Sequence, residues 1–291
     1  MKNIEHKKQI TREWFRDLRD KICLEFEEIE KEYLKIKSNE NKFSTPQKFL
    51  RKEWDRKTID NEKGGGGEMS LMKGNVFEKV GVNISTVYGK FTKEFQKQIP
   101  GADSDPNFFA TGISLVAHMT SPLVPAVHMN TRFIVTTKDW FGGGADLNPM
   151  YEDLDDTNDF HLQFKKACDI YSSDAYNNFK KNCDEYFFIK HRNIPRGVGG
   201  IFYDYLNSGD FDKDFIFTQN VGKAFLEIFP IIVRRNMFKI YDENQRHHQL
   251  VKRGHYAEFN LVYDRGTKFG LETGGNTEAI LMSLPPLAIW E

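Results

Sequence analysis

The 291-residue chain contains only three cysteines, Cys23, Cys168 and Cys183, which lie far apart in the sequence. None of them belongs to a C-x-x-C pair or to a cluster with the spacing of metal ligands. This usage argues against a disulfide framework, a structural zinc site and an iron–sulfur cluster. It is typical of a reducing compartment, so we expect a cytoplasmic location, with an organelle left open.

The chain also lacks a net charge of either sign, because 41 Lys and Arg residues stand against 42 Asp and Glu residues. The cations are dispersed rather than gathered into the basic patch that neutralises phosphates. The composition therefore predicts no nucleic-acid partner.

Long apolar runs are missing as well. No stretch approaches the roughly 18 apolar residues of a membrane span. The opening segment, MKNIEHKKQITREWF, has no apolar core of the signal-peptide kind and carries acids that transit peptides usually avoid. We expect no membrane span and no leader.

Aromatic residues, in contrast, are abundant, at 14% of the chain with 25 Phe and 11 Tyr. Such side chains suit a sheet packed by helices, or a pocket for a flat ligand. The length is sufficient for one large core, so we expect one large domain.

Hydrophobic periodicity predicts a helix over 10–37 and an irregular polar segment over 38–75, in which Gly64–Gly67 is either a turn or a close approach to a ligand. Strands are expected over 75–88, 110–137, 199–205 and 258–264, and helices over 159–170, 175–191 and 217–235, with a kink or restart at Pro230. Strands come mostly first and helices later, without βαβ alternation. This order favours an α+β fold with a mainly antiparallel sheet.

The segment from Phe108 to Met150 carries the densest set of polar groups. If 125–138 is a strand, its period of two places His128, Asn130 and Arg132 on one face. Val127, Met129, Phe133 and Val135 then point to the other face. The polar face would span roughly 13 Å at about 3.3 Å per residue, the scale of a small macrocycle.

Arg132 and Asp146 are the charged residues of this segment with the clearest functional reading. Arg132 is either a surface or salt-bridged arginine or a group that holds a carboxylate or phosphate. Asp146 follows Gly142–Gly144, and this flexible backbone either forms a turn or brings the carboxylate close to a ligand.

Four histidines, His118, His128, His161 and His191, lie near the expected strands or helix ends and could hold a metal ion. Their spacing matches no metal motif, and a hydrogen-bonded structural histidine is the commoner case. His128 is the exception favoured for function, because it shares a strand face with Asn130 and Arg132.

Five segments together resemble a known family: FFATGISLVAH, PAVHMNTRF, WFGGGADLNP, FFIKHRNIPRGVGGIFYDYL and EFNLVYDRGTKFGLETGGNTEAILMSLPP. They are similar to the oxygen-dependent coproporphyrinogen III oxidases over about residues 46–291. The resemblance implies oxidative decarboxylation of two propionates of coproporphyrinogen III to vinyl groups, giving protoporphyrinogen IX in haem synthesis. It implies oxygen as the electron acceptor and no required metal or organic cofactor.

The same resemblance assigns roles to individual residues. Asp146 is expected to accept hydrogen bonds from pyrrole N–H groups, Arg132 to hold a propionate, and His128 to donate a proton. The other expected substrate-binding residues are Ser114, His118, Asn130, Arg196, Gly274, Gly275 and Asn276. Some members of the family have histidines corresponding to His161 and His191 proposed as metal ligands.

One position departs from the family pattern, because Asn276 stands where the tail motif usually has an arginine. A substrate-facing cation is therefore missing there. Gly274 and Gly275 still offer backbone N–H groups, and Asn276 is a suitable N-cap for a following helix.

The resemblance further implies a flat antiparallel sheet flanked by helices on both faces, and a homodimer. We expect a helical extension over 1–45 packed on a single catalytic domain over 46–291. Two alternatives remain open at this point: a metal-dependent oxygenase or hydrolase built on the four histidines, and a tetrapyrrole-binding protein without catalytic activity.

Overall fold

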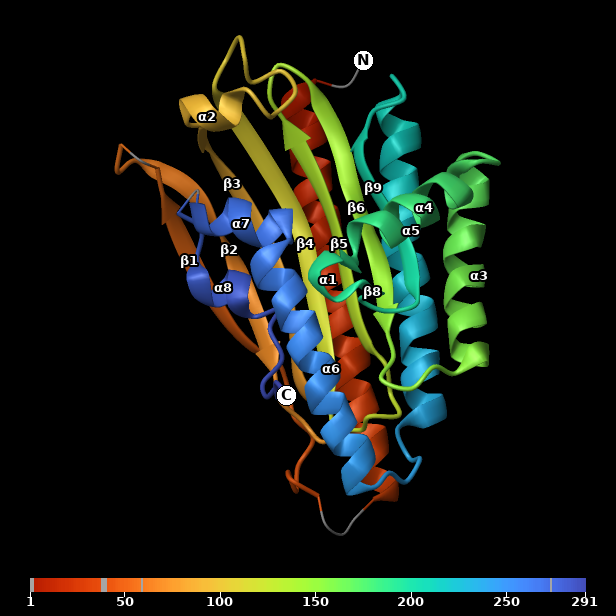
Figure 1. Cartoon of the computed structure of the whole chain (residues 1–291). Coiled ribbons are helices and arrows are strands. Elements are labelled where there is room, and N and C mark those ends of the chain that lie inside the picture. Colours follow the sequence, from red (N-terminus) through yellow and green to blue (C-terminus); the bar gives the residue numbers. More distant parts are fainter. Residues whose placement is uncertain (1–2, 38–40, 59, 273) are drawn as a thin grey trace.

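The computed structural model describes residues 3–37, 41–58, 60–272 and 274–291. At its centre is a seven-stranded antiparallel sheet with the strand order β1-β2-β3-β4-β5-β6-β9 (Figure 1). Its strands are β1 (Leu50–Lys57), β2 (Lys63–Met72), β3 (Phe77–Lys90), β4 (Asn107–Met119), β5 (Ala126–Val135), β6 (Asp139–Asn148) and β9 (Gly199–Leu206). The short strands β7 (Phe188–Ile189) and β8 (Ile194–Pro195) pair separately.

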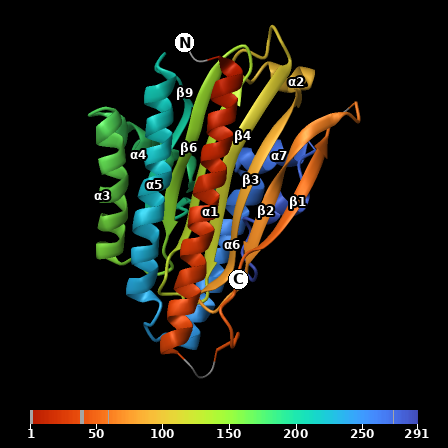
Figure 2. The ribbon, with the colours of Figure 1, turned by 180° about the vertical axis from the view of Figure 1, so that it is seen from behind.

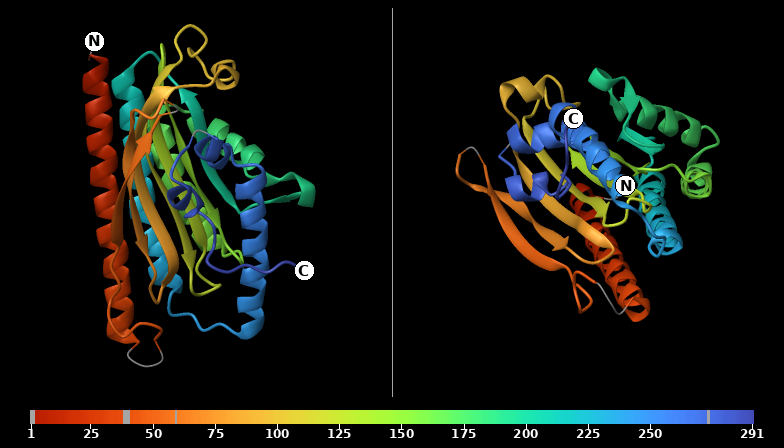
Figure 3. Two further views of the ribbon diagram at one scale, coloured as in Figure 1. Left: turned by 90° about the vertical axis from the view of Figure 1, so that its left-hand side faces the viewer. Right: turned by 60° about the horizontal axis from the view of Figure 1, so that its bottom comes forward.

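Helices cover both faces of this sheet, which confirms the predicted α+β class. The helices are α1 (Ile4–Ile36), α2 (Lys93–Gln96), α3 (Leu154–Tyr171), α4 (Ala175–Tyr186), the 3-10 helix η1 (Lys190–Arg192), α5 (Phe211–Asn236), α6 (Glu243–Val262), α7 (Arg265–Glu272) and α8 (Thr277–Leu281). Helices α1 and α5 lie on one face (Figure 2), whereas α6, α7 and α8 lie on the other (Figure 3). Helix α3 packs on α5, and α4 packs on β9.

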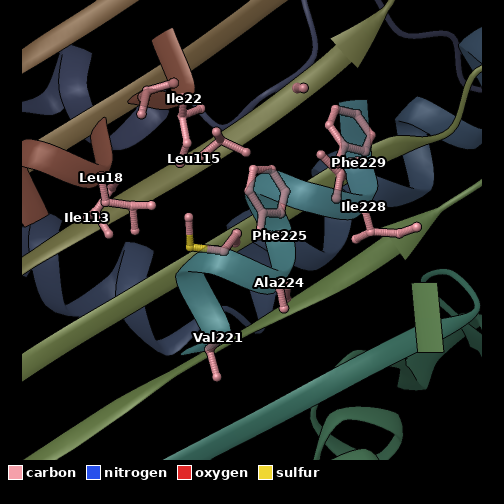
Figure 4. Close-up of a cluster of buried hydrophobic side chains, with 14 of the residues drawn as sticks. Leu18, Ile22, Ile113, Leu115, Val221, Ala224, Phe225, Ile228 and Phe229 are labelled. Carbon is pink, nitrogen blue, oxygen red and sulfur yellow. The ribbon is translucent and has the colours of Figure 1, made fainter. Parts of the chain in front are cut away.

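The main apolar core lies between the sheet and the pair α1 and α5 (Figure 4). Leu18 and Ile22 of α1 meet Phe225 and Phe229 of α5 above Leu115 of β4, and all five are at most 1% exposed. The strands present their branched and aromatic residues to this face because side chains alternate along a strand. The opposite face carries polar and glycine residues together with some apolar side chains such as Phe202.

Strand β5 shows this alternation as the sequence predicts it. Val127, Met129 and Phe133 are fully buried at 0% exposure. His128 and Arg132 point to the face that α6 covers, where both are partly exposed.

Helix α1 is fixed to the sheet by one buried carboxylate. Glu30 is 0% exposed and accepts hydrogen bonds from the backbone N–H groups of Asn75 (2.8 Å), Val76 (2.9 Å) and Phe77 (3.0 Å). A Cβ at Gly74 would lie 2.2 Å from a Glu30 oxygen, so the backbone can approach this closely only because Gly74 has no side chain.

Glu30→Ala should lower the free energy of unfolding by about 3 kcal/mol or more, because it leaves three buried N–H donors without acceptors. Urea unfolding monitored by circular dichroism measures the loss. Glu28→Ala, which removes an exposed carboxylate paired with Lys31 on the same helix, should leave the unfolding midpoint unchanged. Equal effects of the two substitutions would contradict the role of Glu30.

The prediction of an irregular segment over 38–75 is wrong at two strands, whereas residues 38–40 and 59 lie outside the described residues. Strands β1 and β2 occupy 50–57 and 63–72, and Gly64–Gly67 is part of β2 rather than a turn. The β1 sequence LRKEWDRK carries charge on both faces, as suits a sheet edge, so it lacks the apolar alternation of an inner strand. The glycines make room for Trp54, since a Cβ at Gly67 would lie 2.6 Å from the indole ring.

Two further expectations are corrected. Residues 258–264 are not a strand, because helix α6 extends to Val262. A capping box between Asp242 and Gln245 starts this helix, and it buries Tyr256 and Phe259 at helical spacing. Pro230 lies inside α5, which continues through it to Asn236, so the expected restart is wrong and the alternative of a kink stays a prediction.

Helix α5 is long and apolar enough to cross a membrane by length and composition, but 61% of its apolar window is buried inside the protein. Core helices commonly pass the same test. The proposed boundary between residues 1–45 and 46–291 stays a prediction.

Candidate active site

The polar face of the sheet brings together the side chains predicted from the Phe108–Met150 segment. In the register of β5 and β6, His128 lies opposite Asp146, Asn130 opposite Gly144, and Arg132 opposite Gly142. Gly142–Gly144 belong to β6, so of the two alternatives for this segment the turn is wrong. Gly142 and Gly144 of β6 have no side chains, so backbone alone forms this part of the polar face between β5 and β9. We call this stretch the glycine floor.

Asp146 is the centre of a buried charge cluster at one end of this floor. Its side chain is 2% exposed and its carboxylate accepts hydrogen bonds from Arg196 Nη2 (2.7 Å), His128 Nδ1 (2.8 Å) and Asn148 Nδ2 (3.0 Å). Burial by itself raises the pKa of Asp146, but Arg196 and His128 outweigh it and lower that pKa to about 2. The carboxylate is therefore ionised at neutral pH.

Arg196 is held in an aromatic cage. Its side chain is 2% exposed, and its guanidinium carbon lies 4.0 Å from the ring centre of Phe187 and 4.7 Å from those of Tyr256 and Phe259. Arg196 Nη1 also donates to Asn260 Oδ1 at 2.9 Å. Cation–π contacts and a bidentate carboxylate offset the cost of burying this charge. The structure thus places Arg196 against Asp146 rather than at an open surface.

A chain of hydrogen bonds leads from Asp146 along β5. Arg132 has only donors, so its bond to Asn130 Oδ1 (3.1 Å) turns the Asn130 amide nitrogen toward His128 Nε2 (3.0 Å). His128 Nε2 must then accept, and His128 Nδ1–H donates to Asp146. The network fixes one tautomer of a histidine whose side chain is 14% exposed.

Arg132 stands at the other end of the floor. Its Nη2 lies 2.8 Å from Asp204 Oδ1, and its side chain is 28% exposed. Arg265 Nη2 approaches the second Asp204 oxygen at 3.7 Å. Two cations around one carboxylate leave this end of the site net positive, which suits an anionic ligand.

Ser114 and His118 share the polar face of β4 but differ in surroundings. Ser114 lies opposite Asn130 and is exposed. His118 is 1% exposed, and its Nε2 donates to the Ser283 carbonyl at 2.9 Å. Burial, with Arg253 adding to it, lowers the pKa of His118 to about 3.

A histidine that is neutral when folded makes stability depend on pH. In the unfolded chain His118 takes up a proton near its usual pKa, so the folded state should lose stability as pH falls from about 6.5 toward 3, by up to about 1.4 kcal/mol per pH unit. Urea unfolding at about pH 7.5 and about pH 5.5 tests this dependence. His118→Gln should reduce the dependence of the unfolding free energy on pH, with a chelator present in every sample. An equal dependence in the wild type and the variant would rule out His118 as its source.

The four histidines do not converge on one point. His161 of α3 bonds the Val198 carbonyl (3.0 Å) and the Tyr176 hydroxyl (2.9 Å), whereas His191 bonds Glu258 (2.7 Å) and Tyr263 (2.8 Å). Within the residues that the structure describes, no group of three or more His, Cys, Asp or Glu side chains is placed to hold a metal ion.

The tail residues lie on the same side of the sheet, around α7 and α8. Asn276 is the N-cap of α8 and accepts from Ala279 N at 2.9 Å, which confirms its predicted capping role. The N–H groups of Gly274 and Gly275 donate to the carbonyls of Leu271 (3.4 Å) and Gly270 (2.8 Å). In this structure both groups terminate α7.

Several members of the site are missing from the sequence prediction. Asn148 has a local signal, because it follows Asp146 by two residues on the same strand face. Asp204 and the cage have no comparable local signal. The cage rings are Phe187, Tyr256 and Phe259.

The chain has an α+β fold, and one end of the polar face of its sheet has a net positive charge that suits an anionic ligand. A family model described as coproporphyrinogen III oxidase matches residues 10–291. Proteins named oxygen-dependent coproporphyrinogen-III oxidase are similar to this chain over nearly all of its length. The one from Rickettsia bellii is 60% identical over 283 residues, covering 97% of this chain and 98% of the relative.

The corresponding protein of Rickettsia africae is 61% identical over 284 residues, covering 98% of both chains. That of Rickettsia felis is 61% identical over 279 residues, covering 96% of both. The chain therefore belongs to the coproporphyrinogen III oxidase family.

Proposed function

We propose that this protein is an oxygen-dependent coproporphyrinogen-III oxidase of haem biosynthesis. The similarity to its Rickettsia relatives over nearly the full length supports the activity. One structural observation carries the proposal. An ionised, buried Asp146 lies at one end of the glycine floor, and the net positive cluster around Arg132 lies at the other end. The substrate carries inward N–H groups and outer carboxylates, which match these two ends.

The reaction converts a propionate into a vinyl group in two places on the substrate. For each one, R–CH2–CH2–COO⁻ + O2 + H⁺ gives R–CH=CH2 + CO2 + H2O2. Oxygen takes two electrons and two protons, one of which must be supplied. His128 is the proposed proton donor, because it is the partly exposed member of the Asp146 cluster.

Arg132 is the proposed propionate-binding residue. Among the described residues its recorded partners are Asn130 and Asp204, so most of its five N–H donors are available to a carboxylate. Ser114 and Asn130 lie opposite each other beside it and are the proposed neutral binding groups.

Asp146 is the proposed acceptor for the pyrrole N–H groups. Its oxygens already accept from Arg196, His128 and Asn148, so ring N–H groups reach it only where one of these donors turns aside. His128 is the most exposed of the three. Its movement would bring the proposed proton donor to the ring at the same time.

Product analysis tests the activity. Incubation of purified protein with coproporphyrinogen III in air should give protoporphyrinogen IX, and removal of oxygen should stop its formation. Binding of the substrate in air without any conversion would instead support the tetrapyrrole-binding alternative.

Oxygen is the proposed co-reactant, without a metal or an organic cofactor. Each of the four histidines bonds a different protein group, and they do not meet at one point. This arrangement favours a metal-free enzyme over a histidine-ligated metal oxygenase. Metal analysis of the active protein and its rate after chelation distinguish the two. Stoichiometric metal, with loss of activity on chelation, would favour the metal enzyme.

Three further expectations belong with this proposal. The functional unit is a homodimer, so light scattering should give twice the 33.9 kDa mass of the chain. The location is the cytoplasm, and the N-terminal 45 residues act as an extension of one catalytic domain. The family resemblance supports the dimer, and the use of cysteine supports a reducing compartment, since all three thiols are free and buried.

A further inference from the structure

The ion pair between Arg132 and Asp204 lies beside an irregularity in strand β9. Between β6 and β9 the register shifts, so that Phe141 pairs with Leu206 but Gly143 pairs with Tyr203. One residue of β6 thus faces two residues of β9, Asp204 and Tyr205, which is the pattern of a β-bulge. Asp204 continues the alternation of Gly200 and Phe202, which pair with Asp146 and Gly144, so its carboxylate lies on the polar face beside Arg132.

The bulge holds its backbone in an uncommon conformation. Tyr205 has a φ of 54°, in the left-handed region that non-glycine residues rarely adopt, and its N–H donates to Asp204 Oδ1 at 3.1 Å. Such conformations persist where the surrounding structure enforces them and gather at functional sites. Here the enforced conformation fixes the carboxylate that Arg132 bonds.

Gly142 allows the same pair to form across β6. A Cβ at this position would lie 2.8 Å from the guanidinium carbon and Nη2 of Arg132 and 2.8 Å from Asp204 Oδ1. Any other residue would therefore push the two charged groups apart. Two features on neighbouring strands, the bulge with its left-handed Tyr205 and the bare Gly142, therefore adjoin this one contact.

We propose that Asp204 is a positioning residue: it holds the Arg132 guanidinium across Gly142 so that the remaining N–H donors face a carboxylate of the substrate. The proposal rests on the proposed function, in which Arg132 binds a propionate. Asp204 bonds Arg132 Nη2, and Asn130 bonds Nη1, so the two acceptors set the plane of the guanidinium. A fixed plane matters because a bidentate arginine–carboxylate pair needs both groups to be aligned.

Asp204→Ala should raise KM for coproporphyrinogen III by about tenfold with little change in kcat, because ground-state and transition-state binding weaken together. Asp204→Asn keeps an oxygen acceptor of the same shape and should fall between Asp204→Ala and the wild type. The dissociation constant of coproporphyrin III, a ligand that is not converted, should rise with KM.

A double-mutant cycle separates positioning from a structural role. With Arg132→Gln already in place, Asp204→Ala should change neither KM nor the dissociation constant further, because Asp204 acts through Arg132. Asp139→Ala is the matched control. It removes a similarly exposed ion pair, between Lys7 and Asp139 at 2.6 Å, and should leave both constants unchanged even if it lowers Tm.

The outcomes separate this proposal from the proposed function. Wild-type protein that binds coproporphyrin III but converts no coproporphyrinogen would overturn the function, and the dissociation constants would still decide the role of Asp204. A lower Tm with unchanged KM and dissociation constant would show that Asp204 only stabilises the sheet edge. The same tenfold effect of Asp204→Ala in the Arg132→Gln background would also overturn the proposal.

Discussion

Replacing Asp146 by asparagine should reduce kcat for protoporphyrinogen IX formation by about a hundredfold or more. The side chain keeps its shape but loses the charge that balances the buried Arg196 guanidinium. It also replaces the charged acceptor of the His128 Nδ1–H bond with a neutral amide oxygen, which weakens that bond. Both changes affect the proposed proton donor and the proposed acceptor for pyrrole N–H groups.

The same substitution should destabilise the fold, because removing one partner of a buried ion pair typically costs about 3–5 kcal/mol. Two controls separate lost activity from lost structure. Asp156→Asn alters another buried carboxylate, which bonds Arg235 and Asn236 away from the sheet's polar face, and should lower Tm but keep turnover. Asp146→Asn combined with Arg196→Gln removes both charges and should recover stability without activity. Wild-type turnover by Asp146→Asn would remove this residue from the mechanism.

Arg132→Gln should raise KM for coproporphyrinogen III by about ten- to a hundredfold, because the propionate loses a charge-assisted, bidentate partner. Arg132→Lys keeps the charge without the planar pair of donors and should recover only part of the affinity. Steady-state kinetics over a range of substrate concentrations measures both.

Arg234→Gln is the control for a general loss of positive charge. Arg234 is 33% exposed, close to the 28% of Arg132, but it pairs with Glu25 and Glu32 on the α1 and α5 side of the sheet. Its replacement should leave KM unchanged. Equal KM values for Arg132→Gln and the wild type would show that the propionate binds elsewhere.

The face of the sheet that carries the site could be predicted because it depends on local periodicity. His128, Asn130 and Arg132 alternate with apolar residues, and this pattern alone separates the polar face from the core. Asp146 could be named from its segment and the family resemblance, but its position opposite His128 depends on the register of β5 and β6. Register is a property of the paired strands rather than of either one alone.

The partner of Asp146 could not be predicted in the same way. Arg196 lies 50 residues further along the chain and meets Asp146 only through the folded sheet. The cage around Arg196 includes Tyr256 and Phe259 of α6. The stretch EFNLVYD alternates like a strand, and helix formation there depends on burial against the sheet and on the capping box upstream.

Strands β1 and β2 at the edge of the sheet could not be predicted either, because their sequences lack a local signal. Strand β1 carries charge on both faces, and β2 has four glycines directly after its first residue, so neither shows the apolar alternation that indicates a strand. In the fold, β2 is stabilised by pairing with β3, and β1 by pairing with β2. The bulge at Asp204 also has no local signal, because it is defined by the register between β9 and β6.

The most direct test of the account measures oxygen uptake and carbon dioxide release together, with metal-depleted protein and coproporphyrinogen III. We expect two molecules of oxygen to be consumed and two of carbon dioxide to be released for each protoporphyrinogen IX formed. Added metal should not change the rate. Substrate binding without carbon dioxide release, or activity that returns only when a metal is added, would contradict it.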